Sequence, residues 1–376
     1  MTADWFGGQL EAIHGLLRAH FPGVERVAVA LYDPQTDKLK TFVHSTEGES
    51  PLVHYEARLA EVPSLADLAR SGRSRVIDDL LAVRGSSREH ARRLLEAGYQ
   101  SSYTMPVREG GRLFGFLFFD SKLPHYFTPW AVERLAVFGH LLAVILVQSV
   151  TPARMLHSAL RVASRLTHYR DPETGAHLDR MSRYARLIAR SLAPQYGLSD
   201  EFVEFLFLFA PAHDVGKIAV PDRILLKQGP LLEEEFETMK THVTKGAEIV
   251  DGIVRDLGLG AFPHIEVLRN VVLFHHEAID GSGYPEGRAG SQIPVEARMV
   301  TVADVFDALT SERPYKAAWS REAALGYLRE RMGTKFDAAC VSVLLTHTRE
   351  VEEIGLQFRD DEGSGHQSRA GYTLDL

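Results

Sequence analysis

The chain has 376 residues, of which 45% are hydrophobic and 24% are charged, and this composition excludes a disordered or fibrous protein. The length favours two domains over one. The net charge of −8 argues against a protein that binds nucleic-acid polymers through a broadly basic surface.

The single cysteine, Cys340, excludes an internal disulfide and any cysteine-rich metal site. A transition metal would therefore have to be bound mainly by the 17 histidines and by carboxylates. The first residues lack a basic start followed by a long apolar run, so a signal peptide is not expected. Together these features predict a protein of the reducing cytoplasm.

Residues 1–150 show the short alternating runs of a mixed α/β domain. Strands are predicted over 24–33, 39–44, 75–77, 101–107 and 113–119, and helices over 64–71, 87–97 and 128–148. The last two strands should form a hairpin, because Gly110 and Gly111 separate two apolar runs.

The segment Leu135–Ala153 contains no charged residue. Its strongly apolar part, Leu135–Val147, is shorter than the roughly 20 residues that a membrane span needs. We therefore expect a buried or dimer-forming helix and no membrane span. Residues 135–170 should form one helix, or two that are interrupted near Pro152.

Residues 151–350 are predicted to form a mainly helical domain, and residues 351–376 a polar C-terminal tail. The expected fold class is thus α+β with two domains, an α/β domain and an all-α bundle, joined by a long helix. Within the bundle, helices are expected over 202–212, 233–250, 265–274 and 297–309.

Histidines and carboxylates recur beside the apolar faces of five predicted helices. One such histidine is usually a core residue, but a set of them is how helical bundles build metal sites. Eight nitrogen and oxygen ligands exceed what one tetrahedral zinc ion needs, and they suit two or three ions with bridging carboxylates. Imidazole with carboxylate, and without thiolate, suits iron or manganese and does not exclude nickel or zinc. The residues are Glu173, His177, His213, Asp214, His242, His275, His276 and Asp304.

The first half resembles GAF domains, which are sensory or dimerising modules. The resemblance rests on the order of the elements and on the stretch Met105–Ser121, MPVREGGRLFGFLFFDS. It implies a sensory domain whose signal is unspecified.

The second half resembles the HD-GYP subfamily of HD phosphohydrolases. His213-Asp214-Val-Gly-Lys217 is similar to the HD motif, and the run from His275 to Pro285, HHEAIDGSGYP, is similar to the subfamily signature. The stretch from Ala303 to Lys316 is similar to that subfamily too.

This resemblance implies a phosphodiesterase that hydrolyses cyclic-di-GMP to linear pGpG, with GMP as a further product. It implies that the eight residues bind two or three divalent ions, with iron expected and manganese as the alternative. Asp214 would bridge two ions at the catalytic centre, and Glu173 and His177 match the ligands of members with three ions.

The resemblance also implies substrate contacts. Lys217 would reach the reacting phosphate, Arg313 and Lys316 the second phosphate, Tyr284 a guanine or the pocket wall, and Asp307 a base or Arg313. Asp280 would brace the GYP loop or a ligand histidine. The expected partners are cyclic-di-GMP, a second copy through the linker helix and, through the GYP loop, a diguanylate cyclase domain.

Two other functions stay open at this point. One is a catalytically silent receptor for the dinucleotide, which the complete ligand set opposes. The other is an HD phosphohydrolase acting on another nucleotide, such as cyclic GMP-AMP. One departure from the family pattern is Pro211, which precedes the His-Asp pair and should bend its helix.

Overall fold

The computed structural model describes residues 5–83, 89–168, 175–260, 262, 264–312 and 317–359. The chain divides into two compact units, which we describe separately. The first contains residues 1–160, 189–209 and 252–268, and the second contains residues 161–188, 210–251 and 269–376.

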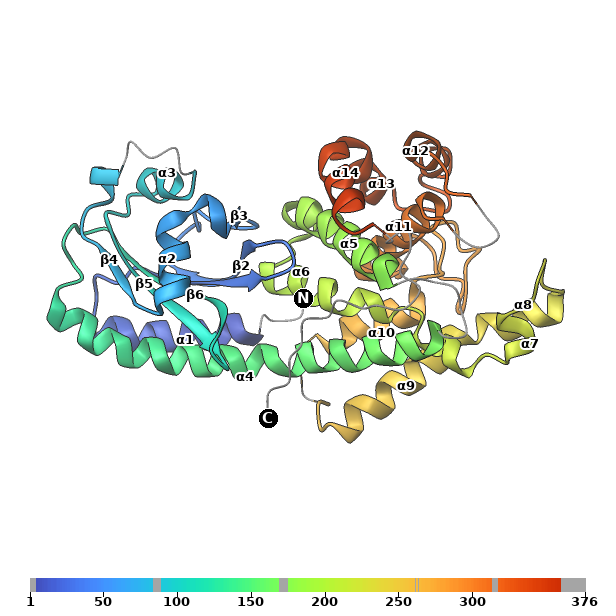
Figure 1. The fold of residues 1–376 in the computed structure, drawn as a ribbon, viewed down its shortest axis with the longest axis horizontal. Coiled ribbons are helices and arrows are strands. Elements are labelled where there is room, and N and C mark those ends of the chain that lie inside the picture. Colours follow the sequence, from blue (N-terminus) through green and yellow to red (C-terminus); the bar gives the residue numbers. More distant parts are fainter. Residues whose placement is uncertain are drawn as a thin grey trace. The chain divides into compact units, whose positions relative to one another are not determined.

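A six-stranded antiparallel sheet forms the centre of the first unit within the described residues (Figure 1). The strands are β1 (Arg26–Asp33), β2 (Lys38–Thr46), β3 (Glu56–Arg58), β4 (Arg75–Ile77), β5 (Ser101–Glu109) and β6 (Arg112–Ser121), in the order β3-β2-β1-β6-β5-β4. The predicted hairpin is confirmed, since β5 pairs with β6 up to Glu109 and Arg112. Gly110 and Gly111 both have positive φ, which this tight turn requires.

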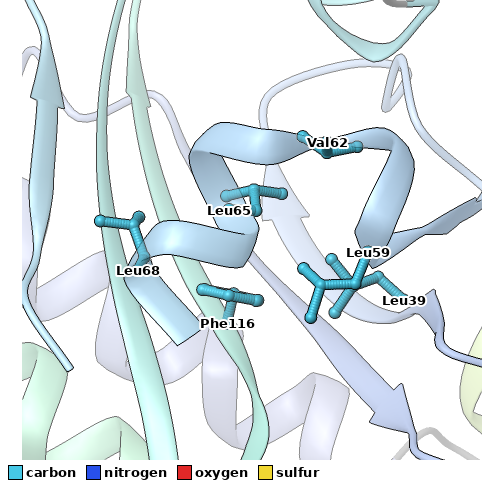
Figure 2. Packing of buried hydrophobic residues seen from close by; sticks show 6 residues of the cluster. All are labelled: Leu39, Leu59, Val62, Leu65, Leu68 and Phe116. Atoms are coloured by element: carbon cyan, nitrogen blue, oxygen red, sulfur yellow. The ribbon is translucent and has the colours of Figure 1, made fainter. Parts of the chain in front are cut away.

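Helices cover both faces of this sheet (Figure 1). The helices α2 (Pro63–Ser71) and α3 (Glu89–Glu96) lie on one face, and α1 (Trp5–His20) and α4 (Pro129–His168) on the other. Proline at the first position of α2 and left-handed Gly72 at its end fix the limits of that helix. Figure 2 shows how α2 closes the sheet through a cluster of buried side chains, namely Leu39, Leu59, Val62, Leu65, Leu68 and Phe116.

The linker helix α4 is continuous, so the alternative of two helices separated near Pro152 is wrong. Pro152 removes one helical hydrogen bond from the carbonyl of Gln148, and the exposure of Gln148 lets water replace it. By length and composition, Pro129–Ala163 is apolar enough to cross a membrane, with a mean hydropathy of 1.8 in its most apolar window. One third of that window is buried within the protein.

Helices dominate the rest of the chain, as predicted. They are α5 (Gly175–Tyr196), α6 (Asp200–Phe209), α7 (Asp222–Leu225), α8 (Glu233–Lys240), α9 (His242–Asp256), α10 (Ile265–Phe274), α11 (Val295–Thr310), α12 (Arg321–Glu330), α13 (Ala338–Thr346) and α14 (Thr348–Gln357). The last of these extends seven residues into the predicted tail, whose remainder from residue 360 lies outside the described residues.

Two predicted helices differ from the structure at the residues that matter for chemistry. The helix expected over 233–250 is two helices, and His242 is the first residue of the second one. The helix expected over 202–212 ends at Phe209 and continues as a 3-10 turn, Ala210–Ala212, that contains Pro211. Proline thus tightens the chain just before His213.

A glycine contact joins two segments of the second unit. Gly216 lies in the 3-10 helix Val215–Ala219, and its backbone packs on the first turns of α9. A Cβ at Gly216 would lie 1.9 Å from the carbonyl oxygen of His242 and 2.5 Å from the amide nitrogen of Gly246. Only glycine permits this approach.

We predict that Gly216→Ala lowers the free energy of unfolding by about 2 kcal/mol or more, because the backbone of α9 must move. The matched control is Gly252→Ala on α9, where a Cβ would have its nearest contact at 3.9 Å. This control should be neutral or stabilising by up to about 1 kcal/mol. Urea denaturation of both variants measures the difference, and equal stabilities would contradict the packing argument.

Candidate metal centre

Three buried histidines of the second unit share one arrangement. The Nδ1–H groups of His213, His242 and His275 donate to the carbonyl oxygens of Ala210 (3.0 Å), Met239 (2.8 Å) and Val271 (3.0 Å). Each carbonyl belongs to a residue three or four positions before the histidine in the chain, within the helical segment that ends just before that histidine. The bond fixes one tautomer and leaves the lone pair on Nε2.

His177 on α5 has the same arrangement with a different acceptor. Its Nδ1 lies 2.7 Å from Oδ2 of Asp307 on α11, and the ring is buried. A carboxylate that accepts this hydrogen bond orients the ring and makes Nε2 more basic. His177 Nε2 is therefore prepared as a ligand in the same way as the other three.

Asp214 lies between two groups of possible ligands. Its Oδ2 is 3.2 Å from Nε2 of His213, and its Oδ1 is 3.2 Å from Nε2 of His242 and 3.6 Å from Nε2 of His275. One oxygen thus faces each group. This is the arrangement that a bridging carboxylate needs.

The two groups each bring their ligand atoms within 4.8 Å of one another. The first contains His177, His213 and Asp304, whose Oδ1 lies 3.6 Å from Nε2 of His177 and 3.7 Å from Nε2 of His213. The second contains Asp214, His242, His275 and His276. The structure therefore brings together seven of the eight predicted ligands, from segments spread over residues 177–304.

The protonation of these residues suits cation binding. Burial lowers the pKa of His275, and desolvation beside His275 holds the pKa of His276 well below its usual value, so both rings are neutral at pH 7. Desolvation would raise the pKa of Asp214, but Lys217 and His213 outweigh it and hold that pKa well below the usual range. The site thus presents neutral imidazoles and an ionised carboxylate, which are the forms that bind metals.

The residues fit a metal centre on a second criterion. Among the described residues, Oδ1 of Asp214 and the Nε2 atoms of His242 and His275 are buried and make no hydrogen bond. Buried polar atoms are normally hydrogen bonded, and three such atoms facing one another are accounted for by a shared cation.

Lys217 and Tyr284, for which the sequence predicts substrate contacts, border this centre. Lys217 Nζ lies 2.9 Å from Oδ2 of Asp214. The ring of Tyr284 stacks on His276, with ring centroids 4.7 Å apart. Desolvation raises the pKa of Tyr284, so its hydroxyl stays protonated.

The loop that carries Tyr284 is folded back on the two adjacent histidines. Gly283 allows this, because a Cβ there would lie 2.3 Å from the amide nitrogen of Ala278 and 2.5 Å from the carbonyl oxygen of His276. Buried Glu277 accepts hydrogen bonds from the backbone nitrogens of Glu286 and Arg288. The loop is therefore held in place by close backbone packing at Gly283 and by the hydrogen bonds to the Glu277 carboxylate.

Asp280 braces the start of this loop, as the sequence predicts. Its carboxylate accepts hydrogen bonds from the amide and hydroxyl of Ser282, and it lies 3.3 Å from Lys335 Nζ. These contacts keep the turn of the GYP loop closed.

The predicted substrate contact of Asp307 is not what the structure shows. Its carboxylate is fully buried and accepts hydrogen bonds from Nε and Nη2 of Arg180, at 2.7 and 3.0 Å, in addition to its contact with His177. Burial would raise the pKa of Asp307, but the bonds from His177 and Arg180 keep it below its usual value. Asp307 thus orients the ring of His177, a candidate metal ligand, and has no surface left for substrate.

Arg180 is a residue that the sequence did not predict. Its guanidinium also donates to the hydroxyl of Ser311 and to the carbonyl of Phe358, so it joins α5 to α11 and to the residue after α14. Phe236 and Lys240 on α8 were missed as well, and both lie against the ring of Tyr284. The predicted residues Glu173, Arg313 and Lys316 lie outside the described part of the chain.

Comparison with protein families agrees with this division of the chain. Residues 10–146 match the GAF domain family, and residues 164–340 match an HD domain family. The chain therefore contains a GAF domain followed by an HD domain.

The chain is similar, over about half of its length, to proteins named as phosphodiesterases. A Xanthomonas campestris protein, named cyclic di-GMP phosphodiesterase response regulator RpfG, is 48% identical over 196 residues, which cover 52% of this chain and 49% of the relative. A cyclic di-GMP phosphodiesterase of Thermotoga maritima is 36% identical over 221 residues, covering 57% of each chain.

A third relative is named for a different substrate. The 3′3′-cGAMP-specific phosphodiesterase 2 of Vibrio cholerae is 39% identical over 178 residues, which cover 47% of this chain and 32% of the relative. The chain spans about half the length, or less, of these curated relatives.

We predict that Asp307→Asn lowers metal affinity by about 10- to 100-fold, because the second partner of a ligating histidine is lost. It should also lower the free energy of unfolding by about 3 kcal/mol, since the buried Arg180 loses its counter-charge. Elemental analysis and urea denaturation measure the two effects.

The matched control is Asp179→Asn. Asp179 lies on α5, as His177 does, and the substitution breaks its ion pair with Arg161 of α4. Its metal content should stay at the wild-type value. Full metal occupancy in Asp307→Asn would show that Asp307 does not orient His177.

Proposed function

We propose that this chain is a metal-dependent phosphodiesterase that hydrolyses cyclic-di-GMP. The observation that carries the proposal is the convergence of imidazoles with Nδ1 tied back and Nε2 facing Asp214, which lies between two ligand groups. The names of the relatives from Xanthomonas campestris and Thermotoga maritima support the substrate.

Two ions fit the described residues. His177, His213 and Asp304 would hold one, and His242, His275 and His276 the other, with Asp214 as the bridge. Such ions accept the charge of phosphate oxygens and lower the pKa of water toward ~7. A third ion depends on Glu173. We propose iron, with manganese as the alternative, because nitrogen and oxygen ligands without thiolate suit both.

The chain's own residues supply the other parts of the reaction. Lys217 is held beside Asp214 and would place its positive charge on the reacting phosphate or on the departing sugar oxygen. The exposed edge of Tyr284 would contact a guanine, and Arg313 and Lys316 would bind the second phosphate. The proposed product is linear pGpG, and further cleavage to GMP would use the same groups.

The choice among cyclic dinucleotides is a second question, which the relative named for 3′3′-cGAMP raises. The two molecules differ in one base, so the wall formed by Tyr284 and its neighbours Phe236 and Lys240 would decide between them. The complete ligand set favours an enzyme over a silent receptor. Contact of the GYP loop with a diguanylate cyclase domain remains part of the proposal.

We also propose that the protein acts in the cytoplasm as a homodimer and that the GAF domain regulates hydrolysis. The helix α4 exposes apolar side chains at successive spacings of 7, 4, 3 and 11 residues, which all fall on the a and d positions of a coiled-coil heptad. They are Trp130, Val137, Leu141, Val144 and Met155, and each is more than half exposed. We call this set the exposed stripe of α4.

We expect Asp214→Asn to lower the turnover of cyclic-di-GMP at least about a hundredfold, because several kcal/mol of charge stabilisation depend on the bridged ions. Chromatography of the products should show the loss of turnover, and elemental analysis should show a loss of bound metal in the same variant. The control is Asp251→Asn, whose carboxylate pairs with Arg269 on the surface and should leave both values unchanged. Wild-type turnover in Asp214→Asn would overturn the proposed function.

For the dimer, we expect wild-type protein to sediment as a dimer and Val144→Glu to sediment as a monomer, because a charge in the seam would be buried without a partner. The matched variant Val144→Leu keeps the seam apolar and should remain dimeric. Identical sedimentation of the charged variant and the wild type would exclude the exposed stripe of α4 as the interface.

A further inference from the structure

The first unit encloses a cavity of about 270 Å³ that the metal centre does not use. It lies between the sheet and the layer formed by α2, α3 and the segments beside them. Leu65 on α2, Val62 just before it and Leu39 on β2 form part of its wall, and Figure 2 labels all three. Most of its surface is apolar.

Strand register places polar side chains together on one part of the wall. Arg26 of β1 and Ser102 of β5 are both paired with Asp120 of the intervening β6. One row further along, Thr104 of β5 neighbours Phe118 of β6 and Arg75 of β4. Arg26, Arg75, Ser102 and Thr104 all line the cavity, and we call them the polar corner.

The polar corner has hydrogen-bonding capacity that the protein does not use. Both oxygens of Asp120 are engaged, by Arg26 Nη1 and by the hydroxyl of Ser102. Nε of Arg26 and the hydroxyl of Thr104 are buried and make no hydrogen bond among the described residues. The two side chains are only 3% and 1% exposed, so bulk water does not satisfy them.

The charge of the wall selects one class of ligand. Two guanidinium groups line the cavity, and no carboxylate is among the described side chains that do so. An anionic group with oxygen acceptors would bond to Arg26 Nε and to the hydroxyl of Thr104. The remaining wall is mostly apolar, with Ala28, Ala30, Leu65 and Phe118 among its residues, and it suits a mainly apolar body. Its polar members are Thr41, Tyr55, Ser64 and His90.

We propose that this cavity binds a small organic acid, an aliphatic or aromatic body that ends in one carboxylate. The cavity volume lies just below the range of about 300–1,000 Å³ found for pockets that take drug-sized ligands, so it suits a small ligand better than a cyclic dinucleotide. A purine nucleotide is also a poor fit, because its base and sugar need polar partners along their whole length, whereas most of the wall is apolar.

The test is calorimetric titration of the full chain with hexanoate, octanoate, decanoate and 4-phenylbutyrate, below the concentrations at which they form micelles. The alcohols and amines of the same carbon skeletons are the matched probes. At least one acid should bind about tenfold tighter than its alcohol, since its carboxylate makes a charge-assisted hydrogen bond in the corner. The amines should bind most weakly.

Two variants locate the site. Thr104→Val removes the hydroxyl without changing the shape of the side chain, and it should lower the preference for acid over alcohol by several-fold. Ala28→Leu fills the apolar part of the cavity and should weaken the binding of acids and alcohols alike. Thermal unfolding of both variants without a ligand checks that they are folded.

Three results would overturn the proposal. The first is that none of the acids binds, or that acids bind no tighter than alcohols. The second is that Thr104→Val keeps the full preference for acids. The third is that GMP binds to the wild type and that this binding is lost in Ala28→Leu, because the cavity would then accept a nucleotide. None of these readouts depends on hydrolysis, so they are independent of the proposed phosphodiesterase activity.

Discussion

The hydrogen bond from each imidazole Nδ1 to a fixed acceptor is the interaction on which the candidate centre depends. It decides which nitrogen carries the proton and therefore which nitrogen can bind a cation. Three of the acceptors are backbone carbonyls at or near the ends of helical segments, where the intrahelical ladder leaves carbonyls available. The ends of helices thus position the ligands, and the break between α8 and α9 gives His242 its acceptor, Met239.

His177 needs another solution because it lies in the first turn of α5. Its acceptor is Asp307, which a buried arginine holds in place from the side. A buried ion pair contributes little to stability by itself, since desolvation offsets the attraction. The pair of Arg180 and Asp307 is better understood as a device for orientation. It also links the ligand to the carbonyl of Phe358, so the end of α14 contributes to the geometry of the centre.

The sequence predicts the site better than it predicts the fold around it. Seven of the eight ligands could be found because imidazoles and carboxylates beside apolar runs are costly to bury unless they bind a partner or a cation, and because motifs fix their spacing. Arg180 gives no such signal, since an arginine on a helix is usually solvated. Its role depends on α11 packing beside α5, which is a tertiary contact. Asp307 was singled out, but its contacts with His177 and Arg180 depend on the same packing and were not predicted.

The sequence did not predict the elements whose local signals are weak. The helix α1 contains Gly7, Gly8 and Gly15, which lower its helical propensity, and burial of Phe6, Leu10 and Leu17 stabilises it instead. The polar corner of the cavity could not be predicted, because Arg26, Ser102 and Thr104 resemble ordinary residues of half-buried strands. Only the register of β1, β6 and β5 brings them to one face.

The composition of α4 follows from its two faces. The exposed stripe follows a seven-residue repeat, and a second stripe with the same repeat is buried within the first unit, at Leu135, Gly139, Leu142, Leu146, Ser149, Ala153, Leu156 and Leu160. Gly139 allows the helix to approach Met105 closely. A helix with two apolar stripes is apolar nearly all round, which is why its hydropathy resembles that of a membrane span. The proposed dimer would use the exposed stripe, while the buried stripe packs within the chain, so each apolar stripe would have its own partner.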